Sequence, residues 1–435
     1  MSQDTAKGSK SDGNGEETFA ALIGIDWADE KHDVHLYDVA SGASEASVLP
    51  HTPEDLVAWA TQLAQRYPGR RVAICLEQAR GALVYALMRY EHLVLFPINP
   101  VTMKRYREAF APSGSKNDPT DAQLLCELLR MHRDKLRAWK PDDAATRQLQ
   151  LLCEDRRKLV EMRINLLLRV KATLKGYFPQ ALTWAGVDLT HPLASDFLLA
   201  WPSLADVQKA REQTVRKFYW AHCVTRPQVL EQRLKEIREA QPLTTDSVII
   251  EAGRLSVQML MTQMRHLNHA VKVYEGRIAA AFKQHPEHDI FASFPGAGPT
   301  LAPRLLVAFG SDRDRFAECG ELQTHSGIAP VIERSGKQVW THWRWACPTF
   351  LRQTFQEYAR SSVVYCGWAR TCYDRMLERG MKPQAAFRAL AFKWQRIMFR
   401  CWKDRMPYNE ERYLKAMQKQ DSPVVKALMA FPAKA

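Results

Sequence analysis

Four carboxylates at the ends of expected strands and helices could bind metal ions. Asp26 directly follows the apolar run 23–25, and Glu77 directly follows a second apolar run. If those two strands are neighbours at the centre of a sheet, both side chains project at the same end. Asp118 and Asp121 are three residues apart at the start of an expected helix, which places their Cβ atoms about 5–6 Å apart on one face.

Clustered carboxylates repel one another unless cations neutralise them. Hard oxygen ligands select Mg²⁺ or Mn²⁺. Two such ions about 3.5–4 Å apart can clamp the attacking and leaving oxygens of a phosphodiester, so the pattern points to a nucleic-acid substrate. Each acid also has an ordinary structural interpretation. Asp118 and Asp121 could stabilise a helix dipole, and Asp26 and Glu77 could be surface acids at strand ends.

The charge of the chain favours the same class of substrate. Its 435 residues include 61 Lys and Arg against 48 Asp and Glu, which gives a net charge of +13 and favours a polyanionic partner. No apolar run approaches the ~20 residues of a membrane span, and the N-terminus is polar, so we expect neither a transmembrane segment nor a signal peptide. The nine cysteines form no C-x-x-C pair, which is typical of reduced cysteines in the cytoplasm.

The elements that must position the acids follow the order βββ-αβ-αβ-α. Apolar runs and turn residues predict strands at 19–25, 34–37, 47–49, 71–76 and 93–98, with helices at 53–69, 82–90 and 119–132. This order is that of the RNase H-like fold. We therefore expect an RNase H-like domain over residues 19–140, after a disordered polar tail at 1–18.

Two long helical stretches follow, at 142–177 and 250–281. The second has apolar residues at a and d heptad positions, interrupted by Gly253, and should exceed about 45 Å in length. Together they predict an antiparallel coiled-coil arm over residues 141–285, although a seam between subunits is equally compatible with the pattern. Residues 180–245 form an insertion that the pattern does not assign.

The last region, 286–405, is predicted to be mostly helical, with helices at 301–309, 346–361 and 384–402. Residues 331–341 alternate around Ser335-Gly336 and predict a β-hairpin with its turn at that dipeptide. The aromatic segments 340–345 and 392–402 could stack on bases, but their spacing favours a place in the core. Residues 406–435 are expected to be a basic, poorly patterned tail.

A turn at residues 295–298 precedes the helix at 301–309 and resembles a helix-hairpin-helix element. Gly296 and Gly298 would let backbone N–H groups approach a phosphate there. The alternative is an ordinary turn between two helices.

These motifs together resemble the DEDD-type transposases of the insertion-sequence-110 and 1111 group, which are recombinases guided by a bridge RNA. The resemblance covers most of residues 20–405, apart from 180–245. The matching segments are Ile23-Gly24-Ile25-Asp26, Leu76-Glu77, Ile98-Asn99-Pro100, Ser115-Lys116-Asn117-Asp118-Pro119-Thr120-Asp121-Ala122, Phe294-Pro295-Gly296-Ala297-Gly298-Pro299, Ser326-Gly327-Ile328-Ala329-Pro330 and Arg334-Ser335-Gly336-Lys337.

The resemblance implies a RuvC-like N-terminal domain, a coiled-coil arm and a C-terminal transposase domain whose serine attacks DNA. It implies that four carboxylates are both catalytic residues and metal ligands, namely Asp26, Glu77, Asp118 and Asp121. Ser335 aligns with the catalytic serine, although Ser-Gly is by itself more typical of a plain turn. The implied nucleic-acid-binding residues are Lys116, Gly296, Gly298, Arg334, Gly336 and Lys337.

The chain departs from the family pattern at three places. Asn117 stands where the family has threonine, and residues 78–81 lack the hydroxyl side chain that commonly follows the glutamate. The segment 343–348 replaces a basic stretch after the hairpin.

The resulting hypothesis is a DNA recombinase that excises and inserts a mobile element through a 5′-phosphoserine link, with Mg²⁺ as cofactor. The implied partners are double-stranded DNA of the element and the target, a structured guide RNA, and further copies of the chain, arranged as a dimer of dimers. The implied location is the bacterial cytoplasm, at the nucleoid. One alternative is a metal-dependent endonuclease of the Holliday-junction resolvase type, which uses water as nucleophile. Another is a non-catalytic nucleic-acid scaffold.

Overall fold

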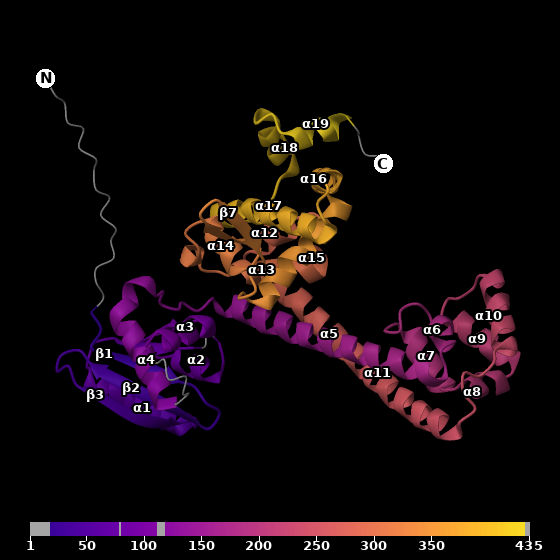
Figure 1. Cartoon of the computed structure of the whole chain (residues 1–435), viewed down its shortest axis with the longest axis horizontal. Coiled ribbons are helices and arrows are strands. Elements are labelled where there is room, and N and C mark those ends of the chain that lie inside the picture. The colour runs from indigo at the N-terminus through magenta and orange to yellow at the C-terminus, as the bar shows by residue number, and fades with distance from the viewer. Residues whose placement is uncertain (1–17, 78–79, 111–117, 431–435) are drawn as a thin grey trace. The chain divides into compact units, whose positions relative to one another are not determined.

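The structure is a computed structural model that describes residues 18–77, 80–110 and 118–430 (Figure 1). The expected tail therefore lies outside the described residues, except for residue 18, and so does Lys116. The chain forms two compact units, Met1–Pro141 and Asp142–Ala435. No helix in the described ranges is long and apolar enough to cross a membrane.

The first unit is built around a five-stranded sheet. Its strands are β1 (Ala21–Asp26), β2 (Lys31–Asp38), β3 (Ser44–Pro50), β4 (Val72–Leu76) and β5 (Leu93–Pro97). They lie in the order β3-β2-β1-β4-β5, with β1, β2 and β3 antiparallel and β1, β4 and β5 parallel. The predicted strands are confirmed, and the mixed α/β sheet fits an RNase H-like fold.

Helices cover both faces of this sheet. On one face α1 (Pro53–Arg66) and α2 (Ala82–Leu87) bury apolar side chains, and on the other α3 (Pro100–Phe110) and α4 (Asp118–His132) do so. A short 3-10 turn, η1 (Arg133–Lys135), follows. Helix α1 begins at Pro53, as the sequence predicts. Thr52 caps this end of the helix, because its side chain accepts a hydrogen bond from the N–H of Asp55. Helix α3 was not predicted, and it carries a residue of the site described below.

The second unit contains two long antiparallel helices, α5 (Ala144–Tyr177) and α11 (Ser247–Lys283). Arg156 of α5 bonds Glu275 of α11, and Arg163 bonds Asn268, so the two helices run in opposite directions. Gly253 does not interrupt α11. Its missing side chain makes room for the ring of Tyr177, which a Cβ would approach to 2.6 Å.

The insertion forms a small helical region between these two helices in sequence. It contains α6 (Ala181–Trp184), α7 (Pro192–Ala200), α8 (Leu204–Lys209), α9 (Glu212–Ala221) and α10 (Pro227–Glu239). Side chains such as Phe197 and Tyr219 form an apolar core there with Leu174 of α5 and Met261 of α11. The segment that the sequence pattern left unassigned therefore packs around the ends of the two long helices.

The C-terminal region is mostly helical, as predicted. It contains α12 (His288–Ala292), α13 (Gly298–Phe309), η2 (Arg313–Arg315), α14 (Cys319–His325), α15 (Thr349–Tyr365), α16 (Gly367–Glu378) and α17 (Pro383–Asp404). Residues 406–435, expected to be an irregular tail, instead contain α18 (Glu410–Lys419) and α19 (Pro423–Ala430). Tyr413 packs against the ring of Trp368, with centroids 5.0 Å apart, which joins α18 to the core.

The hairpin consists of β6 (Val331–Ser335) and β7 (Gln338–His342). Ser335 pairs with Gln338, so the two turn residues are Gly336 and Lys337, and the predicted turn at Ser335-Gly336 is corrected by one residue. Gly336 has a φ of 56°, a conformation that favours glycine at the first position of such a turn.

The aromatic segments divide into two classes. Trp394 and Trp402 are fully buried, which confirms a core position for residues 392–402. Trp340, Trp343 and Trp345 are exposed by 42%, 39% and 76%, so the core prediction for residues 340–345 is wrong. The physical reason is that β7 is exposed along its whole length and the segment after it lies on the surface.

Candidate active site

The edge of the sheet where β1 and β4 end brings predicted acids together. In the parallel pairing of these strands Ile25 lies opposite Leu76, so Asp26 and Glu77 come next at the same edge. This is the convergence that the sequence predicted from the two apolar runs. Both residues are partly exposed rather than buried within the sheet.

Helix α4 reaches the same edge because β1 contains a glycine. A Cβ on Gly24 would lie 2.0 Å from the carbonyl oxygen of Ala122 and 2.5 Å from the backbone nitrogen of Cys126. Only glycine therefore lets the backbone of α4 contact β1 this closely (Figure 1). The contact places the first turn of α4, with Asp121 immediately before Ala122, beside the end of β1.

Asp121 is buried and paired with an arginine that the sequence analysis missed. Its side chain is 2% exposed, and both of its oxygens accept hydrogen bonds of 2.6 Å from Nε and Nη2 of Arg107. The Nη2 atom of Arg107 also lies 4.0 Å from Oε1 of Glu77. One guanidinium group on α3 thus contacts two of the four predicted acids. No motif marked Arg107, because its partners are distant in sequence.

The remaining predicted acid is described only in part. Asp118 begins α4, three residues before Asp121 as predicted, but its side chain lies outside the described part of the chain. Among the described residues there is no group of three or more acidic, histidine or cysteine side chains that could hold a metal ion. The side chains at this edge that could bind a metal ion are nevertheless carboxylates, which suit Mg²⁺. In the structure the positive charge of Arg107 lies beside two of them, Glu77 and Asp121.

Ser335 lies in the second unit, at the last position of β6. The residue is exposed, and it is flanked by the exposed residues Arg334 and Lys337. The hairpin thus presents a hydroxyl between two positive charges, an arrangement that can hold a phosphate group.

The two glycines expected to approach phosphate have different surroundings. Gly296 (φ 78°) packs against α15, since a Cβ would lie 2.9 Å from Tyr365 and Ser361 donates a 2.7 Å hydrogen bond to its carbonyl oxygen. Gly298 (φ 55°) begins α13, and nothing lies within 4 Å of the position of its Cβ. The conformation of Gly296 is explained by protein packing, whereas the space beside Gly298 is open.

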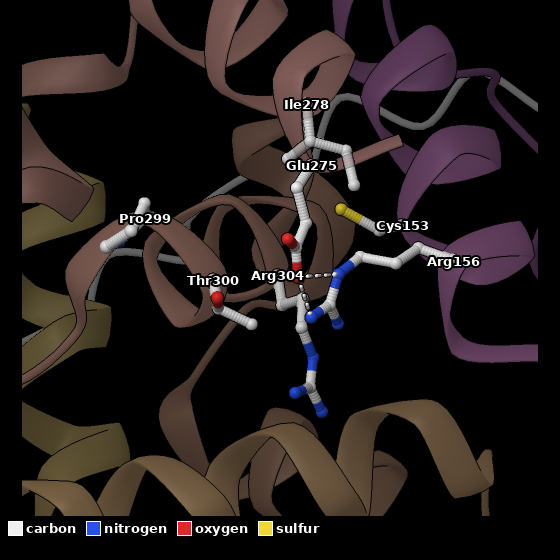
Figure 2. Close-up of a pocket in the computed structure, with 7 residues that line it drawn as sticks. All are labelled: Cys153, Arg156, Glu275, Ile278, Pro299, Thr300 and Arg304. Carbon is white, nitrogen blue, oxygen red and sulfur yellow. Dashed lines mark hydrogen bonds and ion pairs between the residues drawn. The ribbon is translucent and has the colours of Figure 1, made fainter. Parts of the chain in front are cut away.

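A small pocket lies between α5, α11 and the start of α13 (Figure 2). Arg156 and Glu275 form an ion pair of 2.6 Å in its wall, and Arg304 donates a hydrogen bond to Thr354 and pairs with Glu357. The pocket leaves room for about one water molecule, which is too little for a phosphate or a base. We assign it a structural role in joining α13 to the long helices.

Two segments of the chain match known families. Residues 23–179 match a family described as transposase, and residues 288–374 match a family described as the transposase IS116/IS110/IS902 family. The first segment contains the sheet edge with the acids, and the second contains the hairpin with Ser335.

Three related proteins match most of the chain. It is 26% identical over 403 residues to the "mini-circle putative transposase for IS117" of Streptomyces coelicolor, which spans 91% of this chain and 97% of that protein. It is 23% identical over 388 residues (88% and 94%) to an uncharacterized 44.8 kDa protein of insertion element IS116 of Streptomyces clavuligerus. It is 24% identical over 372 residues (82% and 88%) to an uncharacterized 42 kDa protein of insertion element IS900 of Mycobacterium paratuberculosis.

The fold and these matches define the protein as an enzyme of the DNA transposase class. Its C-terminal region is similar to the transposase IS116/IS110/IS902 family, and its N-terminal region is similar to a second transposase family.

Proposed function

We propose that this transposase excises and inserts a mobile element through a covalent link between Ser335 and DNA, with Mg²⁺ held by Asp26, Glu77, Asp118 and Asp121. One observation carries the metal site. Glu77 and Asp121, from distant parts of the chain, share the guanidinium of Arg107 at the edge where Asp26 ends β1. A buried carboxylate such as Asp121 requires a cation, and a bound metal ion would replace Arg107 in that role.

The chain's own residues have separate roles in this proposal. Arg334 and Lys337 hold the scissile phosphate by charge, on either side of Ser335. The Ser335 oxygen attacks phosphorus and loses its proton, the bond to the 3′ oxygen breaks, and that oxygen takes up a proton. Bound Mg²⁺ would stabilise negative charge on the phosphate oxygens. The 5′-phosphoserine link keeps the phosphodiester energy, so a second 3′-hydroxyl can rejoin the strand without ATP.

Guidance by RNA and assembly into a dimer of dimers belong to the same proposal. They rest on the resemblance described above and on the net charge of +13, which suits a protein that binds nucleic-acid backbones. Base pairing by a guide RNA would then select the target. Ser335 would meet the carboxylates either within one chain or between protomers.

A trapping experiment tests the nucleophile. The full-length protein with its co-purified RNA is incubated with Mg²⁺ and a suicide DNA substrate, and the linked peptide is identified by mass spectrometry. We expect phosphate on Ser335 in the native protein and no covalent product with Ser335→Ala. Thr341→Ala is the matched control, because Thr341 is another exposed hydroxyl residue of the same hairpin, and it should give the native product.

Two results would contradict the assignment. One is a link to any other residue. The other is strand cleavage by Ser335→Ala at close to the native rate, which would favour the endonuclease that uses water.

A further inference from the structure

Two of the exposed tryptophans lie just after the hairpin and form a stack with an arginine. The guanidinium of Arg388, on α17, lies over the ring of Trp343. The rings of Trp343 and Trp345 are stacked, with centroids 6.2 Å apart and 30° between their planes. Trp345 is 76% exposed, so this stack of three groups is open to solvent at Trp345.

The cations around this stack have no anionic partner among the residues that the structure describes. Nε of Arg344 and both Nε and Nη2 of Arg388 are buried and form no hydrogen bond with the part of the chain that the structure describes. Arg352 is close enough to Arg388 to repel it, and burial together with that charge lowers the pKa of Arg388 to about 10. Buried donors and neighbouring like charges are costly, so this arrangement indicates a missing anion.

Aromatic rings beside unpaired guanidinium groups suit a single strand of nucleic acid. Each base has a flat face that stacks on an aromatic ring, and each phosphate accepts hydrogen bonds from arginine. In a duplex the faces of the bases are already covered by their neighbours, so only an unpaired base could extend the stack at Trp345. The surface does not suit an apolar protein partner as well, because such a partner would leave the guanidinium groups unpaired.

We propose that Trp343, Trp345, Arg344, Arg352 and Arg388 form a binding surface for unpaired DNA, here called the Trp–Arg surface. A base stacks on the open face of Trp345, and the adjoining phosphates pair with the three arginines. The identification of the strand as DNA rests on the proposed function, because the same hairpin carries Ser335.

The hairpin also sets the spacing between this surface and the serine. Ser335 is at the tip, and Val331, paired with His342, is at the base next to Trp343. Four residues of a strand span about 13 Å. The Trp–Arg surface thus begins about 13 Å along the hairpin from Ser335.

Fluorescence anisotropy of the full-length protein tests the stacking contact. The probes are a labelled 20-nucleotide single-stranded DNA, the same sequence as a duplex, and the same sequence as RNA. We expect Trp345→Ala to weaken binding of single-stranded DNA about tenfold, from the loss of one base stack, and to change duplex binding less than threefold. Trp345→Phe should recover most of the affinity. Trp220→Ala is the matched control, because Trp220 on α9 is also exposed, by 51%, and its removal should have no effect.

A second pair of variants tests the phosphate contact. Arg388→Gln should lower the dependence of log affinity on log salt concentration by about 0.7 for single-stranded DNA, which corresponds to one lost contact. Arg400→Gln lies on the same helix, is 81% exposed and is paired with Asp404, so it should leave the slope unchanged.

Several results would overturn this proposal. They are a change of less than twofold with Trp345→Ala, equal losses for single strand and duplex, or an effect confined to the RNA probe. A change in the oligomeric state of Trp345→Ala, measured by light scattering, would instead assign the surface to contacts between copies. Ser335→Ala should bind all three probes normally, so failure of the serine assignment and failure of this proposal are separate outcomes.

Discussion

The pairing of Arg107 with Asp121 is the contact of the candidate site that can be tested most directly without DNA. Replacing Arg107 by Gln removes the partner of a carboxylate that is 2% exposed. Breaking a buried pair in this way costs 3–5 kcal/mol, and since the Arg107 side chain is itself 22% exposed, we expect about 3 kcal/mol. The loss should appear as local opening of α4 against β1.

Hydrogen exchange of the full-length protein, followed by mass spectrometry, measures this opening. Amides of α4 that exchange through it should do so about a hundred times faster in Arg107→Gln, which is the rate equivalent of about 3 kcal/mol. Lys104→Gln on the same helix is the control. Lys104 faces Glu108 at 3.8 Å with both side chains mostly exposed, so its loss should cost less than about 0.5 kcal/mol.

Metal binding supplies the second half of the test. In Arg107→Gln the carboxylates have lost their counter-charge, so added Mg²⁺ should restore the protection of the α4 amides against hydrogen exchange. In the native protein Mg²⁺ competes with Arg107, so it should increase that protection less. The double variant Arg107→Gln with Asp121→Asn should lose this Mg²⁺ response and recover much of the stability. Equal exchange rates in Arg107→Gln and Lys104→Gln, or an identical Mg²⁺ response in native protein and Arg107→Gln, would refute the reasoning.

Two further predictions concern the same unit. Gly24→Ala should destabilise it by more than about 3 kcal/mol in urea denaturation, because the new Cβ would collide with the backbone at Ala122. The control is Gly276→Ala, at an open helical position, which should be neutral or stabilising. Equal effects of the two substitutions would contradict the close packing of α4 on β1. His32 is fully buried and bonds His51 at 2.8 Å, and burial together with the charge of His51 lowers its pKa to about 4. The folded state therefore binds fewer protons than the unfolded state between about pH 4 and 6.5, so stability is complete above pH 6.5 and falls by up to about 3 kcal/mol toward pH 4. Urea denaturation at pH 7.5 and 5.0 should show this loss in the native protein and a smaller loss in His32→Gln; identical losses would show that another group is responsible.

Much of the fold could be predicted from local patterns in the sequence. The strands of the sheet are short apolar runs bounded by turn residues, and α1 has its cap and first-turn proline in the sequence itself. Helix α11 has apolar residues at heptad positions over many turns. Where the pattern is weak, as in residues 180–245 and 406–435, the helices are short and depend on contacts with other elements.

The candidate site was predictable only where strands determine it. Asp26 and Glu77 each end a buried strand, so their meeting follows from the pairing of β1 with β4. Arg107 lies on a helix that was not predicted, and nothing local relates it to Asp121. The exposure of Trp343 and Trp345 was also missed, because an aromatic residue has the same identity in a core and on a binding surface.

The sequence by itself determined the class of fold, the order of its elements and the residues that we propose bind metal or attack a phosphate, because these depend on residue type and on periodicity along the chain. The tertiary structure decided which charges meet. It placed Arg107 against Asp121 and Glu77, and it brought α4 onto Gly24. It also buried two nitrogens of Arg388 that have no hydrogen-bond partner in the described part of the chain. These contacts join residues far apart in sequence, and their energies depend on burial and distance, which exist only once the chain has folded.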